Sequence, residues 1–168
     1  CRDGRGRYVI PITSRVRFLA RGGALAVYRH VREFTPHVRF VSLVGTETWV
    51  EPRLANEVRP EHDLVVRDSA YTTIIKQRFV EPVSKGKEMS KLFAVNFLEE
   101  RPPAEEVVRQ LGQRLREAAA WADAVLVADF GHGLMQPELR RLAENCAPFL
   151  ALNCQTNSNN HGFNVISR

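Results

Sequence analysis

An acidic residue at the end of an apolar run is the first feature of the chain that could do chemistry. Asp129 follows the apolar residues 124–128 and is followed at once by Gly131-His132-Gly133. The apolar run predicts a buried strand that delivers a carboxylate to a glycine-rich turn. In open α/β sheets, ligands bind beyond the carboxyl ends of such strands. We expect Asp129 to meet a ligand hydroxyl, a metal or neighbouring backbone N–H groups, because a buried carboxylate without a partner is costly.

Two cations on a second expected strand could bind an anion. Lys76 and Arg78 stand two residues apart in the segment 72–80, so that a strand would place both on one face. The guanidinium fork of arginine fits phosphate, and lysine offers a point charge. An exposed edge strand that carries lysine to discourage aggregation would show the same pattern. The residues alone leave both interpretations open.

Further polar and glycine-rich segments could recognise a sugar or a nucleotide. Gly22-Gly23 precedes an expected helix and could bring backbone N–H groups to a hydroxyl or phosphate, although a simple turn would look the same. The segment 153–164 is rich in Asn and Gln, which offer neutral donors and acceptors to a ligand or to the loop itself. His132, between two glycines, is either an exposed loop side chain or a phosphate contact.

These residues need strands and helices to position them, and the sequence predicts an alternation of both. Apolar runs bounded by turn residues predict strands, and helical spacing with proline near the ends predicts helices. The expected strands are residues 8–12, 16–19, 38–44, 64–67, 72–80, 91–98, 124–129 and 149–153, and the expected helices are residues 24–34, 105–123 and 137–145. The alternation predicts an α/β fold, in which segments 72–80 and 91–98 form a hairpin.

The clearest of these elements is the helix expected at residues 105–123. Two glutamates fall in its first turn, where the helix dipole favours acids. Its expected buried face is formed by apolar side chains at steps of three and four, namely Val108, Leu111, Leu115, Ala118 and Ala122. This helix leads directly into the strand that ends at Asp129.

Length and composition bound the kind of protein. A chain of 168 residues with 44% hydrophobic and 26% charged residues suits one globular domain over residues 1–168. No apolar run reaches the roughly 20 residues of a membrane span, and no signal peptide is evident. Three cysteines without CxxC spacing indicate a reduced, cytoplasmic chain without a zinc or other metal site.

The net charge of +5 reflects an excess of arginine near the N-terminus. An anionic partner is one interpretation, and a solvated surface is another. A nucleic-acid partner is not favoured, because no nucleic-acid-binding motif is present and the later charges mix signs. A phosphorylated small molecule accounts for the arginines equally well.

Taken in order, these segments resemble the PfkB, or ribokinase-like, carbohydrate kinase family over most of residues 18–168. Gly22-Gly23 is similar to the sugar-binding turn of that family. The segment 71–78 resembles its T-x-x-K-x-R strand, above all in the ADP-heptose synthase branch, which phosphorylates heptose 7-phosphate. The segment 127–133 resembles the S-D-Y-G-K-G turn of this branch, and the segment 153–164 resembles an N-x-Q-T-N-x-x-N-x-G-F-N stretch.

The resemblance implies an incomplete three-layer ribokinase-like sandwich with a small β lid over about residues 71–98. It implies an ATP- and Mg²⁺-dependent kinase acting on a phosphorylated sugar. Sugar contacts would come from Gly22, Gly23 and Asp129, and phosphate contacts from Lys76 and Arg78. Nucleotide contacts would come from Asn153, Asn157 and Asn164. Family lids often form dimers, and here Phe93, Val95 and Phe97 would be the buried face of a homodimer.

Departures from the family pattern keep other functions open. His132 replaces the lysine of the D-Y-G-K-G turn, Val27 stands near an expected Asn, and Gly45-Thr46-Glu47 replaces G-x-D. The family's G-A-G-D segment, which carries the general base, is expected beyond Arg168, so no catalytic residue is assigned within this chain. The main alternative is a non-catalytic sugar-phosphate- or nucleotide-binding module of the same fold. A scaffold domain and a nucleic-acid binder are the remaining alternatives.

Overall fold

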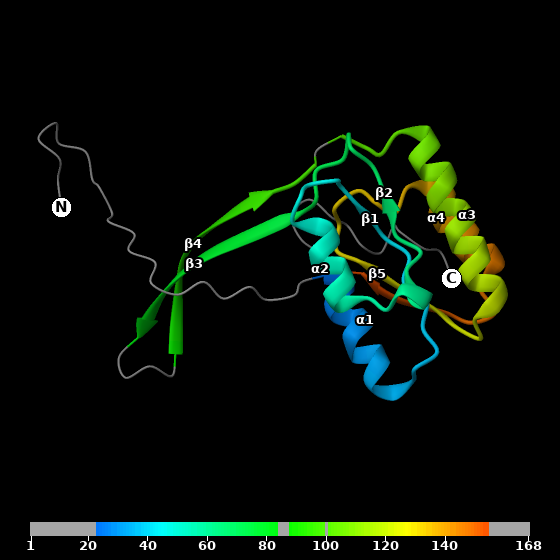
Figure 1. Ribbon diagram of the computed structural model, residues 1–168, viewed down its shortest axis with the longest axis horizontal. Coiled ribbons are helices and arrows are strands. Elements are labelled where there is room, and N and C mark those ends of the chain that lie inside the picture. The colour runs from blue at the N-terminus through cyan, green and yellow to red at the C-terminus, as the bar shows by residue number, and fades with distance from the viewer. Residues whose placement is uncertain (1–22, 84–87, 100, 155–168) are drawn as a thin grey trace, which may run out of the picture.

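The computed structural model describes residues 23–83, 88–99 and 101–154. The helices in these ranges are α1 (Gly23–Phe34), α2 (Val50–Glu57), the short 3-10 helix η1 (Pro60–His62), α3 (Glu105–Trp121) and α4 (Pro137–Cys146). The strands are β1 (Leu43–Val44), β2 (Val66–Arg67), β3 (Ile75–Val83), β4 (Glu88–Phe97), β5 (Val125–Asp129) and β6 (Leu150–Cys154). The fold is a mixed α/β one, as the sequence predicts (Figure 1).

The strands pair in three small sheets. β1 pairs with β2 and β5 pairs with β6, both in parallel, whereas β3 and β4 form an antiparallel hairpin. An isolated parallel bridge between Phe40 and Asp63 extends the β1–β2 pair, and the Phe40 N–H donates to the His62 carbonyl at 2.8 Å. Parallel pairing requires a crossover connection between the strands, and α2 and α4 provide those of β1–β2 and β5–β6.

Helices cover both faces of the β1–β2 pair, because its apolar side chains alternate between the faces. Leu43 and Val66 pack in one cluster with residues of α3 and α4, namely Val107, Leu111 and Leu139. Val44 and Val65 pack in a second cluster with residues of α1 and α2, namely Leu25, Tyr28, Val50 and Leu54. Figure 1 shows α1 and α2 on one side of the strands and α3 and α4 on the other.

The buried face of α3 differs from the expected one. Leu111 and Ala118 are buried as predicted, but Val108, Leu115 and Ala122 are only half-buried. The other buried residues of this helix are Val107, Gly112 and Ala119. The buried stripe is rotated because α3 packs against α4 as well as against β2. The helix ends at Trp121, two residues before the expected end.

Helix α2 was not predicted from the sequence. It carries Pro52 in its first turn, a position that tolerates proline because the first N–H groups of a helix lack intrahelical partners. Only Val50, Leu54 and Glu57 are buried in it, so its apolar periodicity is short. The expected strand at 38–44 is also reduced to the bridge at Phe40 and to Leu43–Val44.

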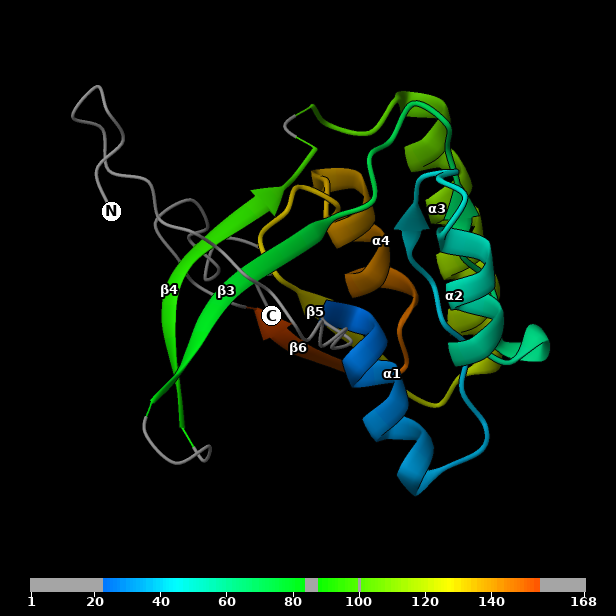
Figure 2. The ribbon, with the colours of Figure 1, turned by 60° about the vertical axis from the view of Figure 1, so that its left-hand side comes forward.

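The β3–β4 hairpin has one apolar and one polar face. Register pairs Ile75 with Phe97, Gln77 with Val95 and Phe79 with Phe93, and paired residues share a face. The other face carries the pairs Lys76–Asn96 and Arg78–Ala94. The sequence therefore predicted correctly that Lys76 and Arg78 share a face. Figure 2 shows the hairpin as a curved arm that leaves the rest of the fold.

Several expected features lie outside the described residues. These are the strands at 8–12 and 16–19, Gly22, Asn157 and Asn164. In the part of the chain that the structure describes, no helix has the length and apolar character needed to cross a membrane.

Candidate functional site

Asp129 ends β5 beside Cys154, the last residue of β6. The two are register partners, and Asp129 is only 7% exposed. Its Oδ1 atom accepts a hydrogen bond from the Gly131 N–H at 2.8 Å, and the Cys154 thiol lies 3.9 Å from Oδ2. Among the partners that the sequence left open for this carboxylate, the structure shows a backbone N–H. Oδ1 thus stabilises the turn, and Oδ2 lies next to the Cys154 thiol, which is a weak hydrogen-bond donor.

The turn after Asp129 takes a shape that depends on glycine. Gly131 and Gly133 have φ angles of 72° and 78°, in the left-handed region that other residues rarely adopt. Among the described residues, no atom lies within 4 Å of a Cβ built on Gly133, so they leave the space beside the turn open there. His132 lies half-buried between the two glycines. The turn can therefore present its backbone closely to a ligand.

The start of α1 lies against this turn. A Cβ built on Gly23 would lie 3.7 Å from the ring of Phe130, and α1 packs along β5. Gly23, which the sequence assigned to sugar binding, has a φ of 58°. The structure thus brings Gly23 and the turn of Asp129 together at the carboxyl end of β5.

Lys76 on the hairpin acts electrostatically on the same turn. Burial lowers the pKa of His132, the Lys76 ammonium lowers it further, and the Asp129 carboxylate opposes both effects. Lys76, Asp129 and His132 are therefore electrostatic neighbours, although they come from segments more than fifty residues apart.

Other residues that the sequence assigned to the site are not gathered there. Arg78 is exposed on the same face of β3 as Lys76. Asn153 is exposed and pairs with Ala128, which places it on the opposite face of the β5–β6 pair from Asp129. Its assignment to a nucleotide remains a prediction.

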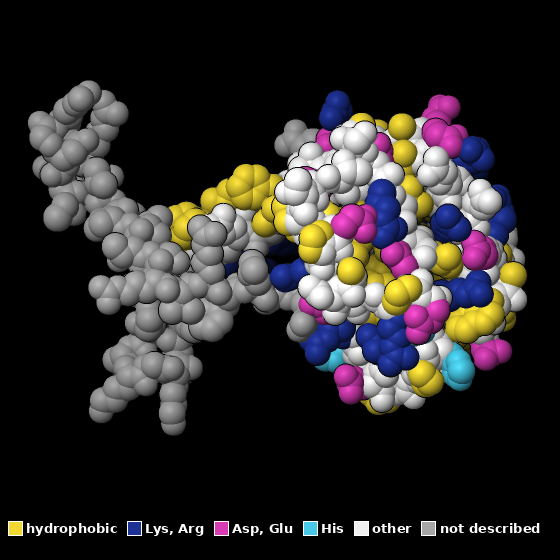
Figure 3. Space-filling view, viewed as in Figure 1, with side chains coloured by type: hydrophobic (Ala, Val, Ile, Leu, Met, Phe, Trp, Pro, Cys, Tyr) yellow, Lys and Arg dark blue, Asp and Glu magenta, His cyan; other side chains and the backbone are white. Residues whose placement is uncertain are grey.

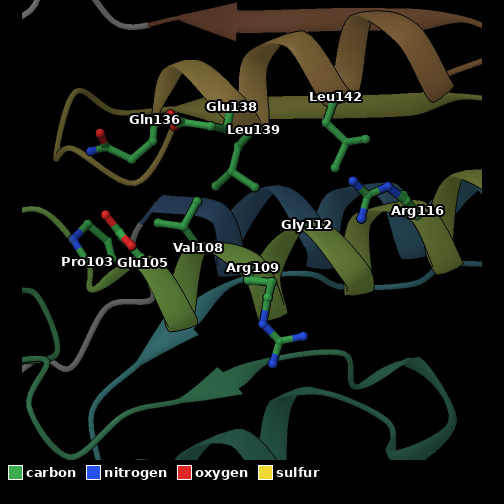
Figure 4. A pocket seen from close by; sticks show the side chains of 10 residues that line it. All are labelled: Pro103, Glu105, Val108, Arg109, Gly112, Arg116, Gln136, Glu138, Leu139 and Leu142. Carbon is green, nitrogen blue, oxygen red and sulfur yellow. The ribbon is translucent and has the colours of Figure 1, made fainter.

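A groove of about 480 Å³ lies elsewhere, between α3 and α4. Leu139 and Leu142 of α4 point toward α3, and Gly112 lets the helices approach, since a Cβ there would lie 3.4 Å from Leu142 (Figure 4). Arg109, on its rim, is held by Glu106 at 2.6 Å. None of the residues predicted to bind substrate lines this groove. We interpret it as a space between two packed helices.

Sequence reasoning missed two residues beside the hairpin. Glu47 accepts two hydrogen bonds from Thr73, which lies just before β3. The only signal was the acidic residue of Gly45-Thr46-Glu47, noted as a departure from a G-x-D pattern. Pairing across 26 residues cannot be read from such a signal.

No protein-family model matches the chain, and no curated protein matches it. Function therefore has to be argued from the site itself. Its parts are a buried carboxylate, a glycine-rich turn open to solvent and a cationic hairpin face. Such a site can accept hydroxyl groups and an anion at the same time. Within the described residues, no group of three His, Cys, Asp or Glu side chains could hold a metal ion.

Proposed function

We propose that this chain is the sugar-phosphate-binding part of an ATP-dependent sugar kinase with a three-layer ribokinase-like fold. One observation carries the proposal: the start of α1 at Gly23 lies against the turn that follows Asp129, at the carboxyl end of β5. This is the edge at which ligands bind in parallel α/β sheets. The order of the sequence segments supports the same proposal.

Each residue then has a separate task in holding the sugar phosphate. The Asp129 carboxylate accepts a hydrogen bond from a sugar hydroxyl, while its other oxygen holds the turn through Gly131. Gly23 supplies backbone groups from the start of α1, and Gly22 is assigned to the same task. Lys76 and Arg78 hold the phosphate that the sugar already carries, a heptose-phosphate-like substrate.

ATP with Mg²⁺ would supply the phosphoryl group to be transferred. In this proposal the described residues orient the acceptor sugar and neutralise its phosphate, and none of them is assigned as the general base. Asn153, Asn157 and Asn164 are assigned to the nucleotide. We place the protein in the cytoplasm, where sugar phosphates and ATP occur and where thiols such as those of Cys146 and Cys154 stay reduced.

A pair of sugars that differ only by a phosphate tests the proposal. Calorimetric titration with heptose 7-phosphate and with heptose should show that a Lys76→Ala, Arg78→Ala double variant loses affinity for the phosphorylated sugar by about a hundredfold. Its affinity for the free sugar should stay within about twofold. Lys91→Ala, which removes an exposed cation of β4, serves as the control and should change neither. Equal losses for both sugars would contradict the assignment.

The alternative function is a non-catalytic sugar-phosphate-binding module. It is favoured by the hydrogen bond from Gly131, which occupies part of the Asp129 carboxylate in a structural role. Because no general base is assigned within these residues, mass spectrometry of heptose 7-phosphate after incubation of the full gene product with ATP and Mg²⁺ separates the two functions. Formation of a bisphosphate supports the kinase, whereas binding without any product supports the module.

The apolar face of the hairpin is proposed to pair with a second copy of this chain. Phe93, Val95 and Phe97 are 36%, 39% and 48% exposed, and Figure 3 shows apolar side chains along the hairpin. An isolated two-stranded hairpin is marginally stable in water, so covering this face would stabilise it. Val95→Lys should shift sedimentation from dimer to monomer, whereas Phe34→Lys, at an apolar residue that is 90% exposed, should not. A wild-type monomer at high concentration would contradict this assembly.

A further inference from the structure

A set of hydrogen bonds joins the end of β1 to the start of the β3–β4 hairpin. The Thr73 N–H donates to Oε1 of Glu47 at 2.8 Å, and the Thr73 hydroxyl donates to Oε2 at 2.6 Å. The same hydroxyl oxygen accepts from the Gly45 N–H at 2.7 Å. Both oxygens of Glu47 are thus used by one residue. These hydrogen bonds fix the position of Thr73 relative to the end of β1.

The hairpin depends on its base for its direction. Within the described residues, β3 and β4 pack mainly on each other. Tyr71, two residues before Thr73, is buried in the cluster with α3 and α4, so the chain leaves the core at residues 71–73. Glu99 lies just beyond β4, and the Thr72 backbone helps to hold its pKa below the usual value, after the larger effect of Arg101. Lys76 follows Thr73 by three residues, and any change of direction at Thr73 moves its ammonium.

The surroundings of Glu47 leave little room for another arrangement. A Cβ built on Gly45 would lie 2.4 Å from the Tyr71 carbonyl oxygen and equally close to Oε2 of Glu47, so the two backbones are in close contact. Burial alone would raise the pKa of Glu47, but the hydrogen bonds from Thr73 outweigh it and hold the pKa below its usual value. The carboxylate is therefore ionised at neutral pH and accepts charge-assisted hydrogen bonds, the stronger kind.

We infer that Glu47 is a positioning residue, which sets the direction of the β3–β4 hairpin through Thr73 and thereby aims Lys76 at the turn of Asp129. The inference that Glu47 sets the direction of the hairpin depends only on its hydrogen bonds with Thr73. The aiming of Lys76 at a phosphate rests on the proposed function. Glu47 itself has no contact with the substrate in this proposal, because both of its oxygens are occupied by Thr73.

Hydrogen exchange of the hairpin amides tests the inference without any ligand. Thr73→Val keeps the shape of the side chain and removes the hydroxyl, whereas Thr73→Ser keeps the hydroxyl. In Thr73→Val we expect the amides of β3 and β4 to exchange about tenfold faster, with those of β5 and α3 unchanged. Thr73→Ser should exchange as the wild type does. Unchanged hairpin exchange in Thr73→Val, or an equal increase throughout the chain, would overturn the inference.

Binding of heptose 7-phosphate tests the link to Lys76. Glu47→Gln keeps the size of the side chain but cannot accept both bonds from Thr73, and it should weaken binding about tenfold. In a Lys76→Ala background the same substitution should have no further effect, since the group that Glu47 positions is gone. Additive losses would overturn the aiming of Lys76. A wild-type chain that does not bind this sugar would contradict the proposed function and the aiming, while hairpin exchange would still decide the role of Glu47 in positioning.

Discussion

The hydroxyl of Tyr28 lies 2.9 Å from Nδ1 of His62, and this buried pair joins α1 to η1. Tyr28 and His62 are only 3% and 6% exposed. The Arg59 N–H donates to the Tyr28 oxygen at 3.3 Å, so one hydroxyl joins both residues. The tautomer of His62 determines whether Tyr28 donates to Nδ1 or accepts from it.

Removing the Tyr28 hydroxyl should destabilise the fold without emptying the core. In Tyr28→Phe the ring still packs on Phe40, whose centroid lies 5.1 Å away, but Nδ1 of His62 and the Arg59 N–H lose their partner. Leaving such buried groups unpaired costs about 1–3 kcal/mol. Urea denaturation of the two proteins measures the difference in free energy of unfolding. A difference below about 0.5 kcal/mol would show that water replaces the hydroxyl.

Stability should fall as the pH is lowered below about 6.5. Burial lowers the pKa of His62, and the charges of Arg59 and Arg32 lower it further against the opposing charge of Glu61. The unfolded chain, in which histidine titrates near 6.5, then binds more protons than the folded chain below that pH. The stability present above pH 6.5 is lost progressively as the pH falls toward the lowered folded pKa.

Urea denaturation at several pH values between 7.5 and 5 measures this loss. His132, whose pKa burial also lowers, contributes in the same direction. His132→Asn should therefore remove part of the pH dependence and leave the part due to His62. A free energy of unfolding that stays constant or rises on acidification would contradict both assignments.

The elements with long, regular patterns could be predicted from the sequence. The helix of α3 starts at Glu105 as expected, and β5 ends at Asp129 as expected, because apolar periodicity and a buried run are local signals. The hairpin register confirms that Lys76 and Arg78 share a face. Helix α2 could not be predicted, since an eight-residue helix with Pro52 in its first turn has little periodicity.

The contacts that build the site were beyond local signals. Asp129 and the glycines around His132 stand close together in the sequence, and their turn was predicted as such. The electrostatic effect of Lys76 on His132 depends on the position of the hairpin, whose base is held by the hydrogen bonds between Glu47 and Thr73 across 26 residues. The spacing of residues in the sequence cannot predict such a long-range hydrogen bond. The buried face of α3 could not be predicted for a similar reason. Which of its apolar residues are buried depends on how the helix packs against α4 and β2.

Two glycines should respond differently to alanine. In Gly45→Ala the new Cβ would lie 2.4 Å from the Tyr71 carbonyl oxygen, so the backbone must shift, at a cost of about 2–4 kcal/mol. In Gly133→Ala the space is open, and only the φ of 78° opposes the substitution, at about 1–2 kcal/mol. Thermal unfolding of both variants checks the order. A larger loss for Gly133→Ala would show that the turn is more constrained than the base of the hairpin.

Asp129→Asn should separate the structural task of this carboxylate from its proposed binding task. In the wild type the Gly131 N–H donates to Oδ1 of Asp129 at 2.8 Å. The amide oxygen of asparagine can still accept this hydrogen bond, so the free energy of unfolding should change by less than about 1 kcal/mol. The second position becomes an N–H donor and can no longer accept from a sugar hydroxyl, so affinity for heptose 7-phosphate should fall about tenfold or more.

Asp68→Asn is the matched control, because Asp68 follows β2 and its Oδ1 accepts the Ala70 N–H at 3.0 Å in the same kind of turn. It should leave both stability and sugar affinity nearly unchanged. If Asp129→Asn lowers stability and leaves affinity intact, Asp129 is only a turn-forming residue, as Asp68 is. The hydrogen bond to Gly131 would then be its whole function, and the sugar would have to be bound by other groups at the strand ends.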